Sequence, residues 1–70
     1  MTWQELCKKA KARKAYVDTN KDGEEYFNLS GSELYFFQRG DIYLDTEYRF
    51  EAVALDRTPE QMLAIMEALK

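Results

Sequence analysis

Histidine is absent from this sequence, and cysteine and proline occur once each. Without histidine the chain lacks the commonest general base and the usual partner of a catalytic serine or cysteine. The single Cys7 falls on the apolar stripe of a predicted helix, where a cysteine usually packs as a small hydrophobic residue. We therefore expect no catalytic residue, no cofactor and no metal ion, and a protein that acts by binding.

Long uncharged apolar stretches are missing as well. The longest covers only a few residues, whereas about 20 are needed to cross a bilayer. One cysteine cannot form an internal disulfide, and no signal peptide precedes the first helical pattern. These features predict a cytoplasmic protein without a membrane partner.

The length of 70 residues allows one small domain with one modest core. Apolar residues make up 46% of the chain and aromatic residues 14%, which is enough to favour a folded chain over a disordered one. No repeat or linker interrupts the sequence. We expect a single domain over residues 1–70.

Helical periodicity occurs at both ends of the chain. Thr2 and Glu5 form a capping-box pattern, which predicts a helix over residues 3–13. Thr58 and Pro59 are typical of an N-cap and a first helical position, so a second helix is predicted to begin there. The apolar stripes consist of Trp3, Leu6, Cys7 and Ala10 in the first helix and Met62, Ile65, Met66 and Leu69 in the second.

Between the helices the hydrophobic period falls to two, and turn signals separate short segments. The strands are predicted at residues 15–19, 24–29, 33–38, 41–45 and 48–55. The last two could also form one bent ribbon, which leaves four or five strands. The predicted fold class is α+β, an antiparallel meander with both helices packed on one face.

The outer face of this sheet is the strongest candidate for a binding site. Alternation directs six apolar side chains inward, namely Phe27, Leu29, Leu34, Phe36, Ile42 and Leu44. It directs Tyr26, Tyr35, Phe37 and Tyr43 outward, among Glu24, Asp41 and Asp45. Exposed aromatic patches usually mark contact sites, so these seven residues are predicted to bind a protein partner. Two alternatives stay open: a curled sheet could pack the rings on each other, or a homodimer could bury them.

Two short motifs have a simpler explanation as turns. Residues 18–23 reproduce the start of a calcium loop, but the twelfth position is Leu29 instead of a bidentate glutamate. A hairpin turn at Asp22-Gly23 explains the same residues, although weak calcium binding stays open. Arg39-Gly40-Asp41 matches the integrin-binding tripeptide, but it falls where a hairpin needs a tight turn.

Charge is distributed unevenly along the chain. Residues 1–14 carry a net charge of +4 and residues 15–70 a net charge of −7. The basic residues of the first segment, which could contact phosphates, are Lys8, Lys9, Lys11, Arg13 and Lys14. Because the acidic remainder repels a polyanion, we expect a solvated face and no direct nucleic-acid binding.

The acidic residues suggest an alternative function, imitation of a phosphate track that would block a DNA-binding protein or a host defence nuclease. The residues that would form this track are Asp18, Asp22, Glu24, Glu25, Asp41, Asp45, Glu47 and Glu51. A net charge of only −3 argues against strong mimicry. A self-associating structural subunit is the remaining alternative, and the sequence leaves open whether the chain is a monomer or a homodimer.

The overall layout resembles small uncharacterised proteins carried by phages and prophages. The likeness rests on the short first helix, the Tyr-rich meander and the closing segment Asp56-Arg57-Thr58-Pro59-Glu60-Gln61-Met62-Leu63. The resemblance implies a protein that binds and modulates host or phage machinery, including inhibition of a host defence nuclease. No functional residue can be carried over from it.

Overall fold

The computed structural model describes residues 1–69, with one helix at each end of the chain. Helix α1 spans Trp3–Ala12 and helix α2 spans Pro59–Ala68. Each begins with a complete capping box, in which Thr2 pairs with Glu5 and Thr58 with Gln61. Both predicted helix starts are confirmed, because the capping side chains satisfy backbone N–H groups that have no partner within the first turn.

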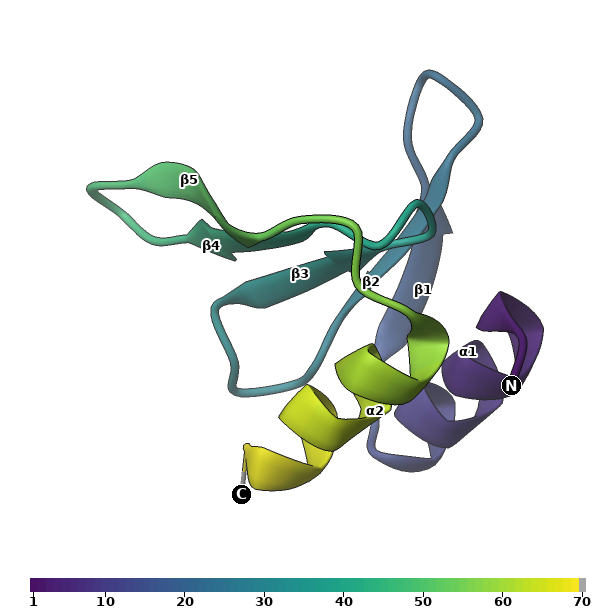
Figure 1. The fold of residues 1–70 in the computed structure, drawn as a ribbon. Helices are drawn as coiled ribbons and strands as arrows, with labels where there is room; N and C mark the ends of the chain where they lie inside the picture. The colour runs from purple at the N-terminus through teal and green to yellow at the C-terminus, as the bar shows by residue number, and fades with distance from the viewer. Residues whose placement is uncertain (70) are drawn as a thin grey trace.

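Five antiparallel strands lie between the helices and pair in sequence order, β1 to β5 (Figure 1). They are β1 (Tyr16–Thr19), β2 (Glu25–Asn28), β3 (Leu34–Phe37), β4 (Ile42–Asp45) and β5 (Phe50–Ala54). The predicted meander is confirmed, with five separate strands. Strand β5 begins two residues later than expected, because the Thr46 N–H donates to the Arg49 carbonyl 2.8 Å away and closes a turn.

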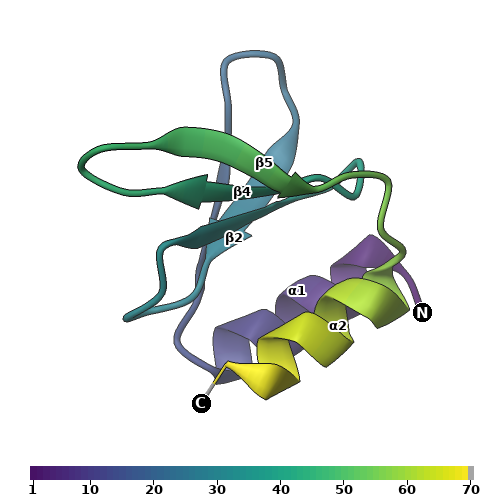
Figure 2. The same ribbon diagram turned by 60° about the vertical axis from the view of Figure 1, so that its left-hand side comes forward.

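The two helices lie side by side on one face of the sheet, as Figures 1 and 2 show. They run in the same direction. At one end the Met1 amine contacts the Glu60 carboxylate at 2.8 Å, and at the other Arg13 donates to the Met66 carbonyl at 3.1 Å. Within residues 1–69 the second sheet face carries no helix, so this arrangement leaves the outer face for other contacts.

The core lies between the helices and the inner sheet face. Phe27 of β2 is paired with Phe36 of β3, and their rings stack with centroids 5.1 Å apart. Trp3 of α1 stacks on Phe27 at 5.4 Å. The buried core consists of Trp3, Leu6, Cys7, Ala10, Phe27, Leu29, Phe36, Ile42, Met62 and Met66. Four of the six residues predicted to point inward are therefore buried, while Leu34 and Leu44 are half-buried.

The hairpin of β4 and β5 extends beyond the helices (Figures 1 and 2). For this reason β5 is exposed on both faces along most of its length. A register shift between Ile42 and Tyr43 leaves Val53 as an extra residue in β5. A bulge of this kind bends the strand and increases its local twist.

The turn between β3 and β4 packs against the chain that precedes α2. The Arg57 N–H donates to the Gly40 carbonyl at 2.9 Å. A Cβ atom at Gly40 would lie 2.4 Å from the Arg57 carbonyl oxygen, and the φ of Gly40 is +105°. Only glycine fits this close approach. Gly40 and the buried Asp41 thus anchor this chain segment, as well as turning the hairpin.

Candidate partner-binding surface

Five aromatic side chains form a continuous row across the outer face of β2 to β5. We call it the outer aromatic row, and it consists of Tyr35, Tyr26, Phe37, Tyr43 and Phe50 in order of contact. Neighbouring ring centroids lie 5.0 to 6.1 Å apart. The strand register produces the row because it places Tyr26 opposite Phe37 and Tyr35 opposite Tyr43.

The outer aromatic row is half-buried except at Phe50. The four aromatic residues that the sequence predicts to face outward are half-buried, because their rings cover one another. Phe50 stacks on Tyr43, yet 64% of its surface is exposed. The surface is thus partly packed against itself, as one of the sequence-based alternatives allows, and open at the β5 end.

Phe50 is the one member of the row that is not among the residues predicted from the sequence to face outward. Its outward direction follows from its place opposite Asp45, two residues after Tyr43 along β4. The length of the β4–β5 turn could have identified Phe50 from the sequence. A turn over residues 46–49 places Phe50 opposite Asp45 and therefore on the same face as Tyr43. Val53 in β5 and Leu55 just after it are further exposed apolar residues, at 51% and 56%.

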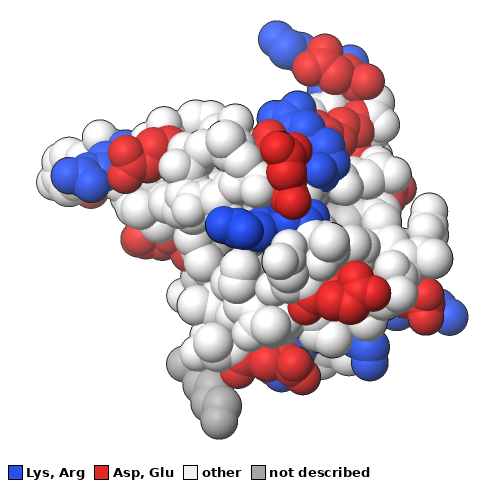
Figure 3. Space-filling model, in the orientation of Figure 1, with Lys and Arg blue, Asp and Glu red and all other residues white. Residues whose placement is uncertain are grey.

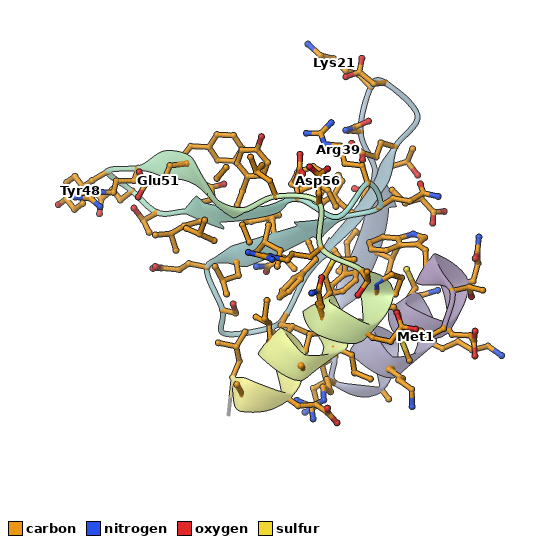
Figure 4. The ribbon with its side chains drawn as sticks, viewed as in Figure 1. Met1, Lys21, Arg39, Tyr48, Glu51 and Asp56 are labelled. Atoms are coloured by element: carbon orange, nitrogen blue, oxygen red, sulfur yellow. The ribbon has the colours of Figure 1, made fainter. Side chains whose placement is uncertain are left out.

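Few charged side chains lie on the surface over the middle of the β4–β5 hairpin. Figure 3 shows mostly uncharged surface over β4 and β5, between the charged tip of their turn and the group around Arg39. In the same orientation, Figure 4 places Tyr48 at the tip of the turn and Arg39 near Asp56. Tyr48 is 88% exposed. The uncharged area thus lies between the group around Arg39 and a turn tip that carries both charged side chains and Tyr48.

The three acidic residues predicted to lie among the outward aromatic residues, Glu24, Asp41 and Asp45, are only partly available for binding. Asp41 is buried, contrary to the expectation that it faces outward with the aromatic residues, and it is 9% exposed. Its carboxylate accepts hydrogen bonds from Arg39 Nε and from the backbone N–H of Asp56. Glu24 accepts from Arg39 Nη1 at 3.1 Å and is half-buried. Of the three residues, only Asp45 is exposed.

Arg39 links the carboxylates to the outer aromatic row. The hydrogen bond to Asp41, followed by the nearby charge of Glu24, raises the pKa of the Arg39 guanidinium. The same guanidinium lies 5.6 Å from the centroid of the Phe37 ring, within the range of a cation–π contact. Glu24 and Asp41 thus hold Arg39 in place over the row and do not form a free acidic edge.

The basic residues of α1 and of the two positions that follow it lie on the layer opposite the outer aromatic row. Lys8, Lys9, Lys11, Arg13 and Lys14 are all exposed. Arg13 is held by its hydrogen bond to the Met66 carbonyl, and Lys14 adopts a left-handed conformation with φ of 65° at the helix end. The exposure of these side chains suits a solvated helix face.

Cys7 is buried in the core, as its place on the apolar stripe predicts. Burial, with a smaller contribution from the negative charge of Glu25, raises the pKa of the Cys7 thiol to about 11. Glu25 itself accepts a hydrogen bond from the Trp3 indole at 2.9 Å on the inner side of the sheet. The thiol is therefore protonated at neutral pH and is a poor nucleophile.

The segment that resembles a calcium loop is organised by hydrogen bonds to Asn20. The Asn20 side-chain oxygen accepts from the backbone N–H groups of Asp22 and Glu24, both at 3.0 Å. Gly23 then turns the chain with φ of 83°. Within residues 1–69, no group of three or more acidic or cysteine side chains is arranged to hold a metal ion.

A shallow hollow of about 460 Å³ opens beside the turn between β2 and β3. Four leucines provide most of its apolar lining, namely Leu29, Leu34, Leu44 and Leu69. Leu44 and Leu69 connect it to β4 and to the end of α2. Among the described residues that line it, Glu33 is the only ionisable one, so the hollow lacks the converging polar groups of a small-molecule site.

The part of the chain that the structure describes has no helix long and apolar enough to span a membrane. No protein family, curated protein or solved structure matches this chain significantly.

Proposed function

We propose that this chain is a non-enzymatic protein-interaction module that binds a protein partner through its outer sheet face. It would act as a small regulator or inhibitor of the kind that phages and other mobile elements carry. The observation that carries this proposal is the outer aromatic row, which crosses four strands on the face opposite the helices and ends at the exposed Phe50.

The chemistry of the row suits a protein partner. Tyrosine and phenylalanine offer large contact areas at a small cost in conformational entropy, and they are enriched at the centres of interfaces. Each ring in the middle of the row is held by a neighbouring ring, and Arg39 contacts Phe37. A preorganised surface loses less entropy on binding than a mobile one. Tyr35, Phe37 and Tyr43 are the proposed anchors.

Nucleic-acid mimicry has less support from the positions of the carboxylates. Glu24 and Asp41 pair with Arg39, Glu25 accepts from Trp3, and Glu51 pairs with Arg49 at 3.3 Å. Carboxylates that are already paired contribute little to a phosphate-like track. An aromatic interface also differs from a mimic in its response to salt, which screens exposed charge pairs but not apolar contacts.

Capture experiments with matched variants test the proposal. Three proteins are immobilised and exposed to a lysate of the cells that encode the chain. They are wild type, the double variant Tyr35→Ala/Tyr43→Ala and the control Lys8→Gln/Lys11→Gln. We expect one set of proteins to bind wild type and control but not the aromatic variant. Binding should persist at about 0.5 M salt, where a charge-dominated contact weakens strongly. Equal capture by all three proteins contradicts the proposed placement.

A further inference from the structure

Strand β5 forms an open edge of the sheet. It is the last strand in the order, and among the described strands it pairs only with β4. The Arg49 carbonyl accepts from Thr46, so the backbone of Arg49 points toward β4. Because backbone polar groups alternate along an antiparallel strand, those of Phe50 and Ala52 point away from β4. Two residues of β5 thus present N–H and C=O groups outward.

This edge has few of the features that usually prevent strand pairing. Natural edge strands are commonly protected by proline, by lysine or by a covering loop. Strand β5 contains neither proline nor lysine, and four of its five residues are exposed. Its protective features are the charge of Glu51 and the bulge at Val53, and the bulge leaves Phe50 to Ala52 regularly paired with β4.

We propose that a second copy of this chain pairs with β5, in antiparallel orientation, about a two-fold axis at Phe50. The argument is charge complementarity. A two-fold axis at Phe50 places Arg49 directly opposite Glu51 of the second copy, and Glu51 opposite Arg49 of the second copy. These are non-hydrogen-bonded positions, where opposite side chains lie closest and where opposite charges stabilise the pair.

Neighbouring registers lack this match. An axis at Glu51 places that carboxylate against its own copy, which is unfavourable. An axis at Ala52 places the bulged Val53 opposite Glu51 of the second copy and brings no charges of opposite sign together. The register centred on Phe50 also keeps the bulge at Val53 outside the cross-copy pairs formed by Arg49, Phe50 and Glu51. Charge and backbone geometry therefore select the same axis.

Pairing in this register would join the two outer aromatic rows. Phe50 of one copy would lie beside Phe50 of the other, and each ring stacks on its own Tyr43 at 5.0 Å. The dimer would leave Tyr26, Tyr35 and Phe37 open on both copies. This inference therefore goes beyond the proposed function, since it concerns the strand edge, and the partner-binding face stays available in the dimer.

Charge-reversal variants test the pairing, with the solution mass measured by sedimentation equilibrium. Arg49→Glu and Glu51→Arg each convert both cross-copy pairs into like-charge pairs, so each variant should raise the dimer dissociation constant about tenfold. An equimolar mixture should restore dimers to near the wild-type level, because the two acidic side chains of one variant then face the two basic side chains of the other. The pair within each chain stays like-charged in this mixture, so only a contact between copies explains recovery.

A backbone variant provides an independent test. Ala52→Pro removes an outward N–H group, and proline is tolerated at such edge positions. We expect dimerisation to weaken while circular dichroism stays unchanged. A wild-type mass of 8.3 kDa at every concentration overturns the proposal. A mixture of the two charge variants that stays monomeric overturns it as well, and neither result affects the test of the outer sheet face.

Discussion

Tyr43 and Phe50 stack across the β4–β5 hairpin with ring centroids 5.0 Å apart and planes inclined by 13°. One ring lies in the half-buried middle of the outer aromatic row, and the other is 64% exposed. The pair joins the packed part of the sheet to the hairpin that projects beyond the helices (Figure 1). Because most of the Phe50 side chain is exposed, we expect it to contribute less to the free energy of unfolding than a buried ring does.

Phe50→Ala and Phe36→Ala should therefore differ strongly in their effect on stability. Phe36 is fully buried, so its truncation should lower the free energy of unfolding by about 3 to 5 kcal/mol. Phe50 loses only one stacking contact, and we expect a loss of about 1 kcal/mol. Urea denaturation measures both values. Similar losses for the two variants would show that the hairpin is packed more tightly than its exposure indicates.

Gly40→Ala should destabilise the fold far more than Gly23→Ala. A Cβ atom at Gly40 meets the backbone of Arg57 at 2.4 Å, whereas one at Gly23 has no atom within 4 Å. Both glycines have positive φ, so the second variant isolates the cost of backbone conformation, about 1 kcal/mol. We expect at least about 3 kcal/mol for Gly40→Ala. Thermal unfolding distinguishes the two, and equal melting temperatures would contradict the close approach.

Asp41→Ala should reduce stability, and Asp45→Ala should not. Asp41 is buried and accepts hydrogen bonds from Arg39 and the Asp56 backbone, so its removal leaves a donor without a partner at a cost of about 2 kcal/mol. Asp45 is exposed, and its truncation should change the free energy of unfolding by less than about 0.5 kcal/mol. Chemical denaturation of both variants tests the assignment. An unchanged free energy of unfolding in Asp41→Ala would contradict a structural role for this carboxylate and make it a candidate for partner binding again.

Cys7 should make stability depend on alkaline pH. Its pKa is about 11 in the folded protein and about 8.5 in an unfolded chain. The contribution of the buried thiol is therefore complete below about pH 8.5 and is lost as the pH rises through about 11. Between pH 8 and pH 10, wild type should lose about 2 kcal/mol more than Cys7→Ala. Urea titrations at the two pH values measure this difference, and parallel losses would argue against a protonated buried thiol.

The sequence is sufficient to predict the order of elements and most of the core. Capping residues at Thr2 and Thr58 and the compact turns carry local information, and alternation identifies Phe27 and Phe36 as inward. These signals involve residues close in the chain. They agree with one another, which is typical of a sequence that specifies one fold.

Two features of the site depend on contacts that local patterns do not encode. Asp41 is buried because it accepts a hydrogen bond from Asp56, fifteen residues further along the chain. Phe50 is exposed because it lies on the outer face of the edge strand β5, where the ring of Tyr43 packs against one side of it. Alternation predicts the face on which a side chain lies, but it does not predict which neighbouring side chains cover it there.

Site-specific photo-crosslinking tests the central claim most directly. A benzophenone amino acid replaces Tyr35, Phe37 or, as a control on the opposite layer, Lys8, in cells that produce the chain. The account predicts a discrete adduct with another protein at Tyr35 and Phe37, and none at Lys8. Adducts of two copies would indicate self-association through this face. The absence of adducts at the aromatic positions, or the same adducts at Lys8, would contradict a binding function for the outer sheet face.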